Sequence, residues 1–131
     1  IKYYLQMFEM TCNERAEKIA PGYAFRFIPD DGVKIYVKTP RNTNGYLIES
    51  LSRGEKIVAT FVLADMINQL SGARVLFIDN IEALDDTWMP AFKNLICSEE
   101  FLAGYDHVFV CGVNNQDVLA TFSGLDANYL S

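Results

Sequence analysis

The sequence predicts an α/β fold in which parallel strands with flanking helices follow an antiparallel hairpin. Three observations support this: a helical apolar pattern over residues 1–19, two alternating strands around a Pro-Asp-Asp-Gly turn, and a later alternation of helices with apolar strands. Helices that alternate with strands predict right-handed crossovers and a parallel sheet. The chain has 131 residues, half of them hydrophobic, so we expect residues 1–131 to form a single domain with a buried core.

The first element is a helix over residues 1–19. Its seam residues recur at alternating spacings of four and three, and they are Ile1, Leu5, Phe8, Cys12, Arg15 and Ile19. This spacing fits a coiled-coil-like seam but favours an amphipathic helix packed on a sheet. Pro21 and Gly22 end the helix.

A hairpin follows the first helix. Residues 23–28 and 33–38 alternate in polarity around the turn at 29–32, where Pro presets φ and Gly tolerates a positive φ. A polar loop over 39–45 then leads to residues 46–50, which we expect to form a short strand.

The second part alternates helices and strands. We expect helices over residues 53–70, 86–102 and 114–122, and strands over 74–79 and 107–113. Both strands are nearly continuous apolar runs, which predicts that they are buried in a parallel sheet. Pro90 fits only in the first turn of its helix.

Composition excludes several classes of protein. The net charge of −6 and the scattered basic residues argue against a nucleic-acid-binding surface on this chain alone. The three Cys have no CxxC spacing, so we expect free thiols in a reducing cytoplasm and neither a disulfide framework nor a zinc site. No apolar run reaches the ~20 residues that cross a bilayer. The start at Ile1 predicts a fragment of a longer protein.

The turn before the helix at 53–70 has two interpretations. Ser52 and Glu55 have the spacing of a capping box, which by itself explains the turn structurally. Gly54 is a poor helix former, yet in the first turn its missing Cβ allows a close approach to the backbone. Because a helix N-terminus also attracts anions, the turn is suited to a phosphate.

The apolar strand over 74–79 ends in a carboxylate. Asp79 lies where ligands bind open α/β sheets, and a carboxylate there commonly holds Mg²⁺. The alternative is a solvated acidic turn in which Asp85 or Asp86 caps the next helix, with Glu82 as a further member.

Taken together, these segments resemble the C-terminal lobe of an ABC-type ATPase head of the SMC, RecF and RecN-like group. Residues 51–55 resemble the signature motif, 78–80 the Walker B motif and 83–85 the D-loop. The resemblance covers about residues 1–120 and depends on the order and spacing of the three motifs. It implies part of a P-loop NTPase fold whose N-terminal half, with the P-loop, is absent from this chain.

The resemblance implies a set of partners and ligands. Ser52 and Gly54 would contact the γ-phosphate of ATP bound to a second head of the same protein, so that nucleotide joins the two heads. The other residues of the motif, Leu51, Arg53 and Glu55, would shape this nucleotide-binding turn. Asp79 would support Mg²⁺, and Asp85 would lie at the dimer interface. DNA would be the substrate of the full-length protein, in repair or maintenance, and no membrane is implied.

The chain departs from the family pattern at catalytic positions. It contains no G-x-x-x-x-G-K-[ST], so the chain alone is expected to be inactive as an ATPase. Asn80 occupies the position of the catalytic Glu, and an amide orients water but cannot accept its proton, which costs ~10²–10⁴-fold in rate. Glu82, two residues on in an extended chain, is a poor substitute for it.

The family's switch His is also missing. Asn114 lies in the corresponding segment and could donate a hydrogen bond to a γ-phosphate, whereas the single His, His107, opens the preceding strand. Three functions therefore remain open: part of an ATPase head that dimerises with ATP, a nucleotide-gated binding switch without effective hydrolysis, and an α/β interaction domain unrelated to ATP.

Overall fold

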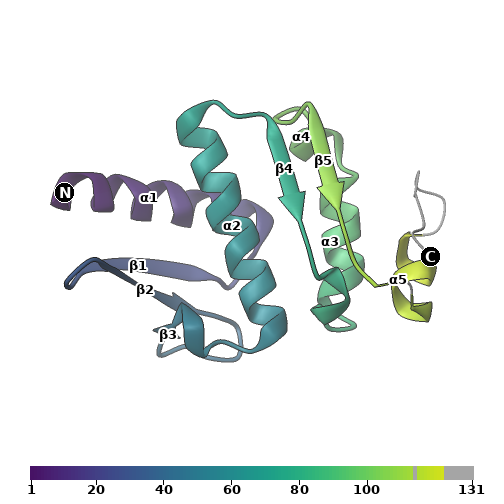
Figure 1. The fold of residues 1–131 in the computed structure, drawn as a ribbon, viewed down its shortest axis with the longest axis horizontal. Helices are drawn as coiled ribbons and strands as arrows, with labels where there is room; N and C mark the ends of the chain where they lie inside the picture. Colours follow the sequence, from purple (N-terminus) through teal and green to yellow (C-terminus); the bar gives the residue numbers. More distant parts are fainter. Residues whose placement is uncertain (114, 123–131) are drawn as a thin grey trace. The chain divides into compact units, whose positions relative to one another are not determined.

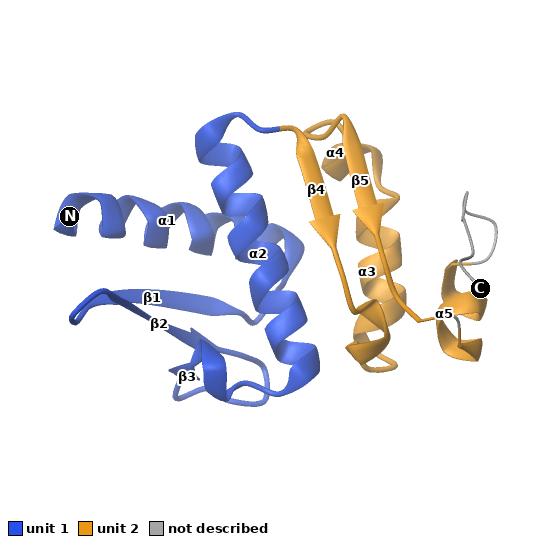
Figure 2. Cartoon of the chain, in the orientation of Figure 1, with its two compact units in different colours: residues 1–73 blue, residues 74–131 orange. Residues whose placement is uncertain are grey.

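The computed structural model describes residues 1–113 and 115–122. They form two compact units, residues 1–73 and residues 74 onward (Figure 2). The elements of the first unit are α1 (Lys2–Ile19), β1 (Ala24–Pro29), β2 (Val33–Lys38), β3 (Tyr46–Leu47), the 3₁₀ turn η1 (Ile48–Ser50) and α2 (Arg53–Ser71) (Figure 1). The elements of the second are β4 (Val75–Ile78), the 3₁₀ turn η2 (Ile81–Ala83), α3 (Trp88–Ile96), α4 (Glu99–Leu102), β5 (His107–Val110) and α5 (Gln116–Phe122).

The first unit packs two helices with a three-stranded antiparallel sheet in the order β1-β2-β3. The predicted hairpin is confirmed, with Phe25 paired to Val37 and Pro29 to Val33. The strand expected over 46–50 is wrong beyond Leu47, because the backbone turns into η1 there.

Helix α1 packs on β1 and α2 through one face. Its buried residues are Leu5, Cys12, Ala16 and Ile19, whereas Ile1 at the start of the predicted seam is 88% exposed. The amphipathic interpretation of this helix is therefore confirmed. Burial, with smaller contributions from Asp65 and Glu9, raises the pKa of the Cys12 thiol to about 12, so this free thiol stays protonated.

Two polar side chains of α1 bind the outer edge of β1. The Phe27 amide donates to Glu9 Oε1 at 2.9 Å, and the Phe25 amide donates to Asn13 Oδ1 at 2.7 Å. Asn13 Nδ2 donates in return to the Phe25 carbonyl at 3.0 Å. Since edge strands expose backbone groups that invite further pairing, these contacts close the β1 edge of the sheet.

The second unit contains the predicted parallel pair. Strands β4 and β5 align with Leu76 opposite Val108 and Ile78 opposite Val110. The expected burial on both faces is wrong, because burial alternates along β4: Leu76 and Ile78 are buried, whereas Phe77 is 61% exposed. An apolar run does not specify how many faces of a strand are covered.

The helix expected over 86–102 is two helices. It is interrupted at Cys97, and Ser98 begins α4 by accepting a hydrogen bond from the Phe101 amide at 3.3 Å. Pro90 lies in the first turn of α3, as predicted. No helix within residues 1–113 and 115–122 is long and apolar enough to cross a membrane.

Candidate nucleotide-contacting turn and acidic loop

The N-terminus of α2 has the predicted capping box. The Glu55 amide donates to Ser52 Oγ at 3.3 Å, and Glu55 Oε1 accepts from the Ser52 amide at 3.1 Å. At the other end, Gly72 closes the helix with a positive φ of 76°. These contacts fix where α2 begins and therefore where its first amides point.

A residue that the sequence did not single out supports this turn. The buried hydroxyl of Thr39 donates to Glu55 Oε2 at 2.6 Å and accepts from the Asn42 amide at 3.1 Å. Thr39 thereby joins the loop after β2 to the start of α2. Burial raises the pKa of Glu55, but the hydrogen bonds from Thr39 and Ser52 and the charge of Arg41 outweigh it, so the pKa lies below its usual value.

The turn is open on its outer side. Ser52 and Arg53 are exposed, Gly54 is half-buried, and Leu51 is buried beneath them. The Glu55 amide bonds Ser52 Oγ and the Lys56 amide bonds the Ser52 carbonyl, whereas the Gly54 amide has no partner among the described residues. An accessible amide at the positive end of a 19-residue helix suits an anionic oxygen.

The loop after β4 positions the acidic candidates of the second unit. Asp79 is exposed, and its Oδ1 accepts from the Asn80 amide at 2.8 Å. Asn80 has a φ of 61°, a left-handed conformation that Asn tolerates better than most residues. The extended backbone that continues β4 therefore ends at Asp79, and from Asn80 the chain turns into η2.

Glu82 lies within η2 and is half-buried. The expectation that it follows Asn80 in an extended chain is wrong, because the left-handed Asn80 and the 3₁₀ turn replace the alternation of an extended strand. Asp85 is one of the two predicted caps: its Oδ1 accepts from the amides of Thr87 at 3.0 Å and Trp88 at 2.7 Å, at the start of α3.

The remaining candidates lie around β5. His107 begins the strand, as expected, and its ring stacks on Phe109 at a centroid distance of 5.9 Å. Asn114 lies outside the described residues.

Arg15 and Asp65 form an ion pair at 2.5 Å that the sequence analysis missed. Two signals could have indicated it: Arg15 is the polar member of the seam of α1, and Asp65 is an acid on the apolar face of α2.

Among the described residues, no group of three His, Cys, Asp or Glu side chains could hold a metal ion alone. Asp79 offers one exposed carboxylate, which is compatible with Mg²⁺ because that ion is usually held by one or two carboxylates together with water and substrate phosphates.

The loop after β4 packs closely against Gly112, just after β5, and this contact gives a testable prediction. A Cβ at Gly112 would lie 2.5 Å from Ile81 Cγ1, and Ile81 is buried. Gly112→Ala should lower the free energy of unfolding by about 1–3 kcal/mol through overpacking, measured by urea denaturation. The matched control is Gly104→Ala, whose Cβ would meet only the Phe101 carbonyl oxygen at 3.5 Å; equal effects would refute the packing argument.

No protein-family model matches the chain, and a search of curated proteins gives no significant match. Solved structures do match. An SMC head bound to the C-terminal winged-helix domain of ScpA is 22% identical with a TM-score of 0.66, covering 92% of this chain and 38% of that one.

Two further structures are similar. A structure from a study of ATP-driven dimerisation and DNA-stimulated activation of SMC ATPases is 22% identical with a TM-score of 0.64, covering 92% of this chain and 76% of that one. An Smc head domain with coiled coil and joint from Pyrococcus yayanosii is 24% identical with a TM-score of 0.64, covering 84% of this chain and 22% of that one. The chain thus has a mixed α/β fold shared with SMC head domains.

Proposed function

We propose that this chain is the C-terminal part of an SMC-like ABC-type ATPase head, in which the turn from Leu51 to Glu55 engages ATP bound to a second head. The observation that carries the proposal is the open, capped N-terminus of α2, where the Gly54 amide has no partner among the described residues and Ser52 is exposed. The fold shared with SMC heads supports it.

In this proposal the two units supply different parts of the reaction. The Ser52 hydroxyl and the Gly54 amide would donate to terminal phosphate oxygens, since charge-assisted hydrogen bonds to anions are strong. The Asp79 carboxylate would support Mg²⁺ through water. The P-loop that holds the nucleotide would come from a segment outside this chain, and DNA remains the proposed substrate of the whole protein by analogy alone.

The proposal is tested by a pair of substitutions at Ser52 that differ mainly in charge. Asn and Asp both cap helices well, so Ser52→Asn and Ser52→Asp should unfold within about 0.5 kcal/mol of each other. Only Asp places a negative charge against the phosphate. The test uses a protein that joins this chain to its P-loop segment. We expect ATP-dependent dimerisation to persist in Ser52→Asn, whereas the association constant of the dimer should fall at least tenfold in Ser52→Asp, because like charges repel.

Dimer formation is measured by analytical ultracentrifugation with and without Mg-ATP. Ser71→Asp, at the opposite end of the same helix, controls for the added charge. Equal dimerisation of the two Ser52 variants would contradict the proposal.

A second candidate function is a nucleotide-gated binding switch without effective hydrolysis. It is favoured by one observation: Asn80 follows Asp79 in a left-handed conformation that suits Asn and would strain Glu. The backbone is thus adapted to the residue that lacks a general base. Single-turnover hydrolysis by the protein with its P-loop distinguishes this function from that of an active ATPase.

A further inference from the structure

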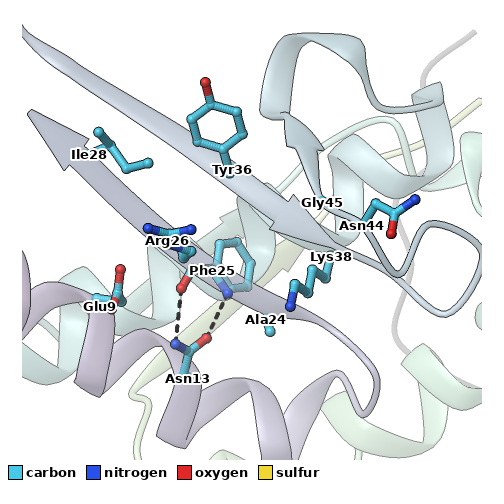
Figure 3. A pocket seen from close by; sticks show the side chains of 10 residues that line it. All are labelled: Glu9, Asn13, Ala24, Phe25, Arg26, Ile28, Tyr36, Lys38, Asn44 and Gly45. Atoms are coloured by element: carbon cyan, nitrogen blue, oxygen red, sulfur yellow. Dashed lines mark hydrogen bonds between the residues drawn. The ribbon is translucent and has the colours of Figure 1, made fainter. Parts of the chain in front are cut away.

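The first unit contains a pocket on the open face of its hairpin. The pocket has a volume of about 440 Å³ and is lined by β1, β2, α1 and the loop before β3 (Figure 3). This volume falls in the range of ligand-binding pockets. Nothing in the proposed ATP chemistry uses it.

Two cations line this pocket side by side. Arg26 lies opposite Tyr36 in the register and Lys38 lies opposite Ala24, so the two cations are diagonal neighbours on one sheet face. Both are exposed, and within residues 1–113 and 115–122 neither forms an ion pair or a side-chain hydrogen bond. They are therefore available to an anionic ligand.

The stem of Lys38 lies close to the backbone at Gly45. Gly45 has a φ of 82°, and a Cβ there would lie 3.3 Å from Lys38 Cγ. The stem of Lys38 therefore runs against the backbone of the loop before β3, and the Asn44 amide lines the same wall.

The pocket is also partly apolar and carries one carboxylate. Ile28 and the ring of Tyr36 line one side, and Glu9 lies on the α1 side, where its Oε1 accepts from the Phe27 amide. Two cations and one carboxylate give the pocket a small positive charge in a chain of net charge −6. A mixed surface of this kind fits a peptide that has both acidic and apolar side chains.

We propose that this pocket binds a short acidic segment of a partner protein, with a Glu or Asp carboxylate held by Arg26 and Lys38. An aliphatic side chain of the segment packs on Ile28 and Tyr36. The closed β1 edge excludes binding by strand addition on that side, so the segment is held through its side chains. A DNA duplex fits less well, since duplex binding depends on many Lys and Arg contacts to phosphates and this pocket is lined by two cations.

The proposal is tested with the full chain and a fluorescein-labelled peptide, Gly-Leu-Glu-Leu-Glu-Gly, by fluorescence anisotropy. The same peptide with Gln in place of Glu should bind at least tenfold more weakly, because it lacks the carboxylates that form charge-assisted bonds. Arg26→Gln and Lys38→Gln should each weaken binding of the acidic peptide about tenfold.

Lys34→Gln is the matched control. It removes the same charge from the same hairpin, but Lys34 pairs with Asp30 at 2.8 Å and does not line the pocket, so binding should change less than twofold. Thermal melting checks that each variant folds. Three results would overturn the proposal. They are an equal loss of affinity in all three variants, equal affinity for the Gln peptide, and no saturable binding of the acidic peptide. Tighter binding of a 12-base-pair DNA duplex, lost in Arg26→Gln, would overturn it in favour of a nucleic-acid site.

Discussion

Replacing Arg15 with Leu is expected to lower the free energy of unfolding by about 3 kcal/mol, because it leaves a buried carboxylate without its guanidinium partner. Arg15 Nε and Nη2 donate to the two carboxylate oxygens of Asp65 at 2.5 and 3.3 Å, so the pair is bidentate. The Asp65 side chain has 0% exposure and that of Arg15 has 21%. Truncating one partner of such a pair costs far more than an exposed ion pair contributes.

Urea denaturation of the full chain measures this effect. Arg26→Leu is the matched control, since Arg26 is exposed and has no ion pair among the described residues, and it should change stability by about 0.5 kcal/mol or less. Replacing both partners, Arg15→Leu with Asp65→Leu, should recover most of the loss, because a buried pair can be exchanged for apolar side chains at little cost. A loss in Arg15→Leu no larger than that of the control would refute the importance of the pair.

Replacing Asn80 with Glu is expected to raise ATP hydrolysis ~10²–10⁴-fold in the protein that joins this chain to its P-loop segment, because a carboxylate can take the proton that an amide cannot. This result rests on the proposed function. The same change should lower the free energy of unfolding by about 1 kcal/mol, since Glu is strained at the left-handed φ of 61° that Asn80 adopts.

The control is Asn80→Gln, which has the length and backbone strain of Glu but no base. Both variants should lose the same stability, and only Glu should gain turnover, measured as phosphate release. Equal rates for Glu and Gln would show that position 80 does not act on the attacking water.

The sequence predicted those elements whose signals are local. Ser52 and Glu55 specified the start of α2, and the turn before Val33 specified the hairpin, because capping and turn chemistry depend on neighbours in the chain. The break before α4 is also encoded locally, in Ser98 followed by two Glu residues, but the helix predicted over 86–102 runs across it.

Features that depend on distant contacts were not predictable in the same way. Thr39 binds Glu55 from a loop 16 residues away, and no local pattern marks it. The exposure of Phe77 depends on what covers each face of the β4–β5 pair, which an apolar run does not encode. The close approach of Ile81 to Gly112 likewise joins two loops that are distant in the chain.

The bonds from Glu9 and Asn13 to the backbone of β1 also have a mechanical consequence. They restrict rotation of α1 about its own axis, because turning the helix would break three hydrogen bonds to the strand. The Arg15–Asp65 pair clamps the same helix to α2. A torque applied to α1 would therefore pass as rigid-body motion to the hairpin and to the α2 helix, whose first turn begins at Ser52.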